Sequence, residues 1–135
     1  MNLKQQRIFR IIATIAYLLI ILNGDMIGLP FFLWLSFTLF DFGNIDQLFA
    51  FLAVAGLTIN LINANKQRTL KILLLDVMCF LLLAAPVIAR LLEAPINLFN
   101  YAAFIIPTTV FVLFYLVSLY FACKEYFKNR NSANL

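Results

Sequence analysis

Long apolar stretches separated by short polar breaks dominate the pattern of this chain. A membrane-spanning helix needs roughly 20 predominantly apolar residues, and the apolar positions here run on without the polar face or alternation of a soluble element. The pattern predicts an all-α, polytopic membrane protein, a four-transmembrane-helix bundle in a single domain that covers residues 1–135. The expected helices are residues 5–22, 46–64, 70–92 and 97–123.

A further apolar stretch, residues 26–40, does not fit as a span. It has 15 residues and is interrupted by Pro30, whereas a straight span needs roughly 20 residues. Its aromatic residues Phe31, Phe32 and Trp34 suit the headgroup region of a membrane. We therefore expect a re-entrant or interfacial segment between the first and second spanning helices.

The distribution of charge favours four spans over five. Lys and Arg prefer the cytoplasmic side of short loops. With four spans, nine of the ten basic residues lie on one side, and only Arg90 is an exception. A fifth span would move the central basic loop to the other side. We expect an inner or plasma membrane location with both termini in the cytoplasm, and an exterior side that carries Asp25, Asp41, Asp46 and Glu93.

Composition argues against several function classes. Hydrophobic residues make up 64% of the chain and charged residues 12%, which is not the composition of a soluble enzyme. The chain has no His, the commonest general base and metal ligand, and it has no phosphate-binding or nucleophile motif. The net charge of +4 follows from the basic loops. We expect no enzyme activity, cofactor, metal site or nucleic-acid partner.

Asp76 is the first candidate site residue, because it lies inside the expected helix 70–92 among leucines. A carboxylate within a membrane is costly and asks for a reason. It lies about 8 Å beyond Lys71 along the helix, near the inner edge of the hydrocarbon. Two interpretations remain open, a proton or cation site and a structural carboxylate that faces the bundle. Side chains expected at similar depth are Thr58, Asn60, Tyr115, Ser118 and Tyr120.

The expected helix 46–64 carries a face of small and amide side chains. At 100° per residue, its members fall within a sector of roughly 100°. Small residues let helices approach closely in lipid, and Asn can form hydrogen bonds across the contact. This face is expected to be buried within the fold, to contact another subunit or to line a polar pathway. Its members are Ala53, Gly56, Asn60, Asn63 and Ala64.

Arg90 and Glu93 form the second candidate site. They are three residues apart at the outer end of the expected helix 70–92, so they share a helix face and can pair. The pair has two interpretations. It is either a structural ion pair, or a site where Arg90 binds an anionic ligand or lipid headgroup at the outer surface and Glu93 tunes that binding.

Two function hypotheses follow from this inventory. The first is a structural or partner-binding membrane subunit, surrounded by the lipid bilayer and joined to copies of itself or to another membrane protein. The second is an oligomeric channel, small transporter or membrane-permeabilising effector that uses Asp76 and the Asn60/Asn63 face. Polar groups that are buried and paired with one another favour the first hypothesis, and a shared water-accessible cavity favours the second.

Overall fold

The computed structural model describes residues 3–23, 28–64, 66 and 69–133. The described part of the chain is mostly helical, with one short antiparallel hairpin and one 3-10 turn. Its elements, in order, are α1 (Leu3–Leu18), β1 (Ile21–Asn23), β2 (Gly28–Pro30), α2 (Phe31–Thr38), α3 (Ile45–Asn63), α4 (Leu70–Glu93), η1 (Ile96–Phe99) and α5 (Ala102–Ala133).

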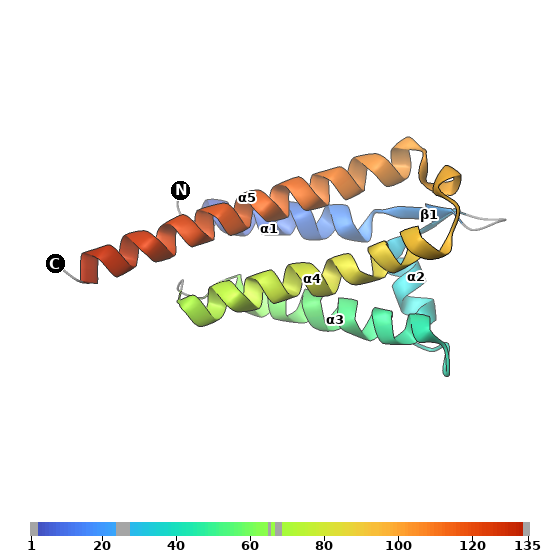
Figure 1. The fold of residues 1–135 in the computed structure, drawn as a ribbon, viewed down its shortest axis with the longest axis horizontal. Helices are drawn as coiled ribbons and strands as arrows, with labels where there is room; N and C mark the ends of the chain where they lie inside the picture. The colour runs from blue at the N-terminus through green and yellow to red at the C-terminus, as the bar shows by residue number, and fades with distance from the viewer. Residues whose placement is uncertain (1–2, 24–27, 65, 67–68, 134–135) are drawn as a thin grey trace.

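The four long helices form two antiparallel pairs that lie one over the other (Figure 1). The closest helix pairs are α1 with α5 and α3 with α4, and α4 also contacts α5 between the two layers. The start of α1, the end of α3, the start of α4 and the end of α5 lie at one end of the molecule. The β-hairpin and α2 lie at the opposite end.

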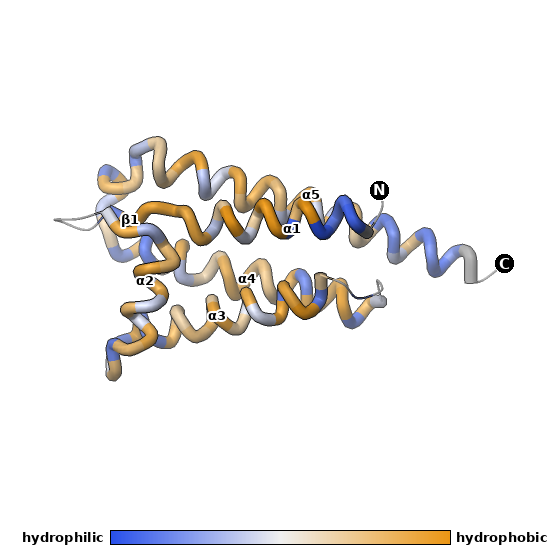
Figure 2. The backbone as a smooth tube through the Cα atoms, turned by 180° about the vertical axis from the view of Figure 1, so that it is seen from behind, coloured by the Kyte–Doolittle hydropathy of each residue, from blue (hydrophilic) through white to orange (hydrophobic). Residues whose placement is uncertain are grey.

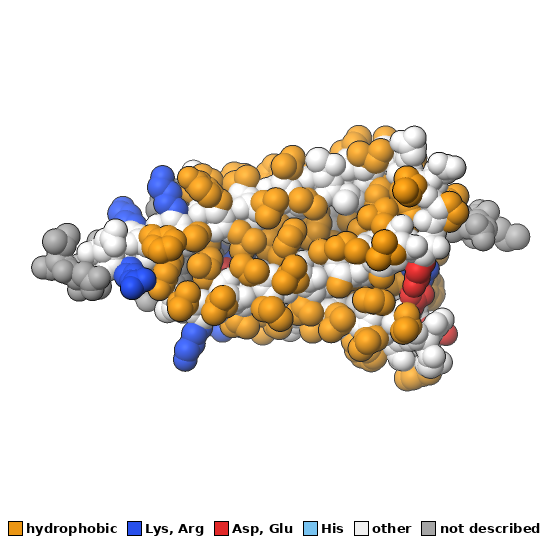
Figure 3. All heavy atoms as spheres, in the orientation of Figure 1, with side chains coloured by type: hydrophobic (Ala, Val, Ile, Leu, Met, Phe, Trp, Pro, Cys, Tyr) orange, Lys and Arg blue, Asp and Glu red, His pale blue; other side chains and the backbone are white. Residues whose placement is uncertain are grey.

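Three of these helices are long and apolar enough to cross a membrane, judged by length and composition. They are residues Ile45–Asn63, Leu70–Glu93 and Ala102–Asn131. The bounds of α3 and α4 lie within one residue of the helices predicted from the sequence. Apolar residues also follow the backbone through most of the bundle (Figure 2), and large apolar side chains cover its visible face (Figure 3). The length and apolar composition of these helices support the predicted association with a membrane.

Charged side chains separate to the two ends of the molecule. Most Lys and Arg gather at the end that holds the start of α1 and the end of α5, and acidic side chains are visible near the hairpin end (Figure 3). The exceptions are Arg90, which pairs with Asp46 at the hairpin end, and Asp76 and Glu125, which lie toward the basic end. This matches the separation expected from the sequence, although Asp25 and Arg68 lie outside the described residues.

The first predicted helix, residues 5–22, ends four residues early. The α1 helix stops at Leu18, and Ile21 already pairs with Pro30 in the hairpin. A Cβ at Gly28 would lie 2.6 Å from Asn23 Oδ1, so the exposed Asn23 side chain would have to shift to accept one. With 16 residues, α1 is about 24 Å long, which is shorter than the roughly 30 Å hydrocarbon core. A fourth complete helical span is therefore not confirmed.

The segment predicted as re-entrant or interfacial, residues 26–40, consists of β2 and the short helix α2 in its described part. Pro30 directly precedes the first residue of α2, a place where its missing N–H costs little. The ring of Phe31 is fully buried and stacks on Trp34, with 5.2 Å between ring centroids. The segment thus packs on the end of the bundle, and neither a re-entrant nor an interfacial position is confirmed.

The last predicted helix, residues 97–123, is displaced toward the C-terminus. Residues Ile96–Phe99 form η1, and α5 runs from Ala102 to Ala133. The polar residues after Cys123, beyond the end of the predicted helix, are helical up to Ala133. Two contributions explain this extension. Gln6 of α1 donates a 2.6 Å hydrogen bond to Glu125. Arg130 lies in the last turn of α5, where a positive charge interacts favourably with the helix dipole.

Tyr101, just before α5, joins the hairpin to the helical layer. Its hydroxyl donates a hydrogen bond to the Ile21 carbonyl and accepts one from the Asn23 N–H at 2.9 Å. Burial raises the pKa of Tyr101, an effect that the hydrogen bond from Asn23 partly opposes. Because the folded pKa is raised, the stability from these bonds is fully present below the ordinary tyrosine pKa of about 10. It is lost only as pH rises above that value.

Tyr101→Phe is expected to lower the free energy of unfolding by about 1–2 kcal/mol, because it leaves a backbone donor and acceptor without their partner. Unfolding of the purified protein in detergent, followed by circular dichroism, measures the change. Tyr120→Phe is the matched control, because Tyr120 of α5 is 64% exposed. Equal midpoints for the two variants would contradict a structural role for the Tyr101 hydroxyl.

Candidate functional site

A buried ion pair between Arg10 and Asp76 forms the centre of the candidate site. Arg10 is 1% exposed and Asp76 is fully buried. The two residues meet because α1 and α4 both begin at the basic end of the molecule. Arg10 lies seven residues after the start of α1, and Asp76 lies six residues after the start of α4. Both are therefore about 10 Å along their helices.

Side chains from the other two long helices complete this cluster. Arg10 Nε donates to Ser118 Oγ of α5 at 3.3 Å. Asn60 Nδ2 of α3 donates to Thr14 Oγ1 of α1 at 3.0 Å. The Tyr115 hydroxyl of α5 lies 3.4 Å from Asn60 Oδ1 and 3.2 Å from the Asp76 carbonyl oxygen. We call the following residues the ion-pair network: Arg10, Thr14, Asn60, Asp76, Tyr115 and Ser118.

The ion-pair network ties α1, α3, α4 and α5 together at one depth. The interior of the bundle has a low effective dielectric constant, so the attraction between Arg10 and Asp76 is strong and the cost of removing both charges from water is also high. The additional hydrogen bond from Arg10 Nε to Ser118 Oγ helps to offset that cost. The arrangement is suited to holding helices in one relative position.

Sequence reasoning placed Asn60, Tyr115 and Ser118 at the depth of Asp76, and the structure brings all four residues into this network. Asp76 and Asn60 are both linked to Tyr115, as expected from their depth. Two other expected partners lie elsewhere. Thr58 is exposed and donates to Val54 of its own helix, and Tyr120 is mostly exposed.

Asn63 is buried on the same face of α3 as Asn60. Its Nδ2 atom has no hydrogen-bond partner within the described residues, and the same holds for Arg10 Nη1. Of the other predicted members of this face, Ala53 and Gly56 are also buried, whereas Ala64 is half-buried. A Cβ at Gly56 would lie 3.1 Å from Leu82 Cβ, so α3 and α4 approach closely there.

Arg10 is the member of the candidate site that sequence reasoning missed, because it was counted only among the basic residues near the start of the first predicted helix. Two signals were available. Gln6, Arg10, Ala13 and Tyr17 recur at spacings of four, three and four residues, which places them on one helix face. All four are buried. Arg10 and Asp76 also have nearly equal depths on helices that start from the same side.

The second candidate site lies at the acidic end of α4. Arg90 Nη1 lies 3.5 Å from Glu93 Oε2, and Arg90 Nη2 lies closer, at 2.5 Å, to Asp46 Oδ2 of α3. The guanidinium also stands over the Trp34 ring of α2, at 4.8 Å from the ring centroid. Arg90 thus connects three helices. The Asp46 and Trp34 contacts were not expected, because both join residues that are distant in sequence.

Neither site offers an evident catalytic arrangement. The described residues contain no group of three or more His, Cys, Asp or Glu side chains that could hold a metal ion. Cys79 is buried beside Asp76 on α4. The chain matches no protein-family model, no curated protein and no solved structure.

Proposed function

We propose that this protein is a non-enzymatic membrane subunit that binds a partner within the bilayer, either another membrane protein or further copies of itself. The observation that carries this proposal is the burial of the ion-pair network. The carboxylate of Asp76 and the amide of Asn60 are used inside the bundle, where they hold helices together. Because these polar groups fix the helices relative to one another, the outer surface of the bundle keeps one shape that a partner can bind.

The proposal includes four crossings of the membrane. Three are α3, α4 and α5. The fourth is α1 together with β1, whose combined length exceeds the roughly 30 Å of hydrocarbon. Backbone groups beyond α1 have partners, as a membrane requires: Phe31 N–H donates to the Ile20 carbonyl at 2.7 Å, and Tyr101 donates to the Ile21 carbonyl. The basic end, which carries both termini, faces the cytoplasm.

The surface open to a partner is apolar. Leu74 of α4 and Leu113 of α5 are more than half exposed. Leu113 lies in the middle part of α5, and Leu74 lies in the second turn of α4. Between apolar helices in lipid, close packing is the main source of association. We therefore expect the partner to contact the helices through shape and not through charge.

Two measurements test this proposal together. Purified protein in liposomes should conduct no ions or protons above protein-free vesicles. In intact membranes, a photo-cross-linker at position 74 or 113 should give a product of one defined mass, whereas one at the buried position Tyr17 should give none. Flux that rises with the amount of protein, or cross-linking to lipid alone at every exposed position, would contradict a partner-binding role.

A channel or transporter is the second candidate function, because the buried Asn63 Nδ2 lacks a hydrogen-bond partner within the described residues. In an oligomer, Asp76 and the Asn60/Asn63 face would then contribute to a polar pathway. Asn63→Leu distinguishes the two functions. If flux is present and this variant abolishes it while the protein remains folded, the channel function is supported.

A further inference from the structure

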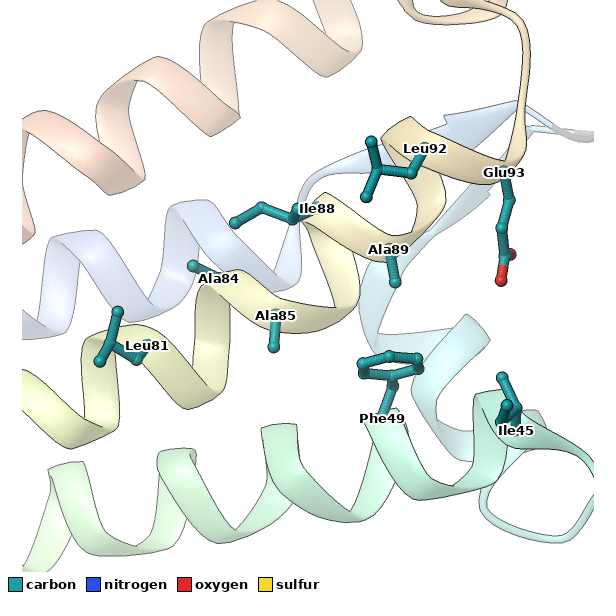
Figure 4. Close-up of a pocket in the computed structure, with 9 residues that line it drawn as sticks. All are labelled: Ile45, Phe49, Leu81, Ala84, Ala85, Ile88, Ala89, Leu92 and Glu93. Carbon is teal, nitrogen blue, oxygen red and sulfur yellow. The ribbon is translucent and has the colours of Figure 1, made fainter.

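An apolar groove lies between α3 and α4 on the outer surface of the bundle (Figure 4). Its volume is about 550 Å³. The small side chains of Ala84, Ala85 and Ala89 on α4 leave an open space, and larger side chains line the rest of the groove (Figure 4). The other lining residues are Ile45, Phe49, Leu81, Ile88, Leu92 and Glu93.

The dimensions of this groove match one leaflet of a bilayer. Along α4 it extends from Leu81 to Glu93, a distance of about 18 Å. Half of the hydrocarbon core of a bilayer is about 15 Å thick. Leu81 lies near the middle of α4 and Glu93 at its end, so the groove runs from the bilayer centre to the headgroup level.

The polar end of the groove carries an excess of negative charge. Asp46 and Glu93 share the single guanidinium of Arg90, and Asp46 makes the closer contact. The Glu93 side chain is 46% exposed, compared with 19% for Asp46. Glu93 is therefore the carboxylate available to an approaching group. This end of the groove complements a cationic group and repels an anionic one.

We propose that this groove binds one acyl chain of a phospholipid with a primary-amine headgroup, in the leaflet at the acidic end of the molecule. The acyl chain lies along Ala85 and Ala89, and the ammonium group of the headgroup pairs with Glu93. The apolar lining, the length of one leaflet and the charge at the rim each support this occupant. The inference goes beyond the proposed partner-binding role and requires only that the helices lie in a membrane.

Native mass spectrometry tests this inference on the purified full-length protein in micelles. The micelles contain equal amounts of phosphatidylethanolamine and phosphatidylglycerol with identical acyl chains. The wild type is expected to retain one lipid, with a preference for phosphatidylethanolamine of about two- to fivefold, the range of an exposed ion pair. Glu93→Gln is expected to keep the lipid but lose the preference.

Filling the groove is the second arm of the test. Ala85→Leu and, independently, Ala89→Leu should remove the retained lipid. Ala55→Leu is the matched control, because Ala55 is exposed on α3 outside the groove. Equal lipid retention in the wild type, Ala85→Leu and Ala89→Leu would overturn the proposal, as would a preference that Glu93→Gln leaves unchanged. A protein dimer that both groove variants dissociate, with no retained lipid, would assign the groove to a second copy of the chain instead.

Discussion

Asp76→Asn is expected to lower the free energy of unfolding by about 3–5 kcal/mol, the usual cost of breaking a buried ion pair from one side. The variant keeps nearly the same side-chain shape but leaves the Arg10 guanidinium buried without its counter-charge. Helix α1 must then expose Arg10 to solvent or keep an uncompensated charge inside the bundle. Equilibrium unfolding in mixed micelles of increasing denaturing detergent, followed by circular dichroism, measures the effect.

A double variant distinguishes the effect of breaking the ion pair from the effect of substituting residues at these two positions. Replacing both Arg10 and Asp76 by Leu removes the two charges together, and replacing a buried pair by apolar residues is often neutral or stabilising. We therefore expect the double variant to be more stable than Asp76→Asn. Asp41→Asn is the control for loss of an exposed carboxylate and should change stability by less than about 0.5 kcal/mol. A double variant no more stable than Asp76→Asn would contradict the importance of the pair.

Gly56→Leu is expected to destabilise the protein by about 1–3 kcal/mol, the range for overpacking a close contact. Already the first added carbon would lie 3.1 Å from Leu82 Cβ and 3.4 Å from the Cys79 carbonyl oxygen. Because Leu82 Cβ is attached directly to the backbone of α4, the 3.1 Å contact is relieved only if α3 moves away from α4. The same unfolding measurement quantifies the loss.

The neighbouring Ala55→Leu is the matched control for Gly56→Leu. It adds apolar volume to the same helix at an exposed position, where a leucine meets lipid or detergent. It should leave the midpoint of unfolding nearly unchanged. If both substitutions shifted the midpoint equally, the effect would come from helix propensity and not from the contact between α3 and α4.

Local properties of the chain explain why α3 and α4 could be predicted within one residue. An apolar run of suitable length is helical in a membrane whatever its neighbours are, since its backbone hydrogen bonds are satisfied within the segment. The start of α4 is also marked locally, because Thr69 caps its first turn by accepting a hydrogen bond from the Ile72 N–H. The ends of α1 and α5 were predicted less well. They depend on contacts with distant residues, such as Tyr101 with Ile21 and Gln6 with Glu125.

The candidate sites show the same division between local and distant information. Arg90 and Glu93 share a helix face at a spacing visible in the sequence, so their proximity could be predicted. The stronger contact of Arg90, with Asp46, crosses 44 positions of the chain. Asp76 was identified because a carboxylate inside an apolar run is conspicuous. Its partner Arg10 was not, because a basic residue near a helix end ordinarily marks the membrane boundary.

The sequence by itself determined that this protein has helices suited to a membrane environment, where α3 and α4 begin and end, and how most of the charge separates along the bundle. These properties follow from composition and periodicity within single segments. The tertiary structure alone decided that α1 turns Arg10 toward Asp76, that α1 gives way to a hairpin after Leu18 and that α3 and α4 enclose an apolar groove. Each of these features depends on which helices become neighbours. That choice is set by the packing of all segments together, and no local pattern in the sequence reveals it.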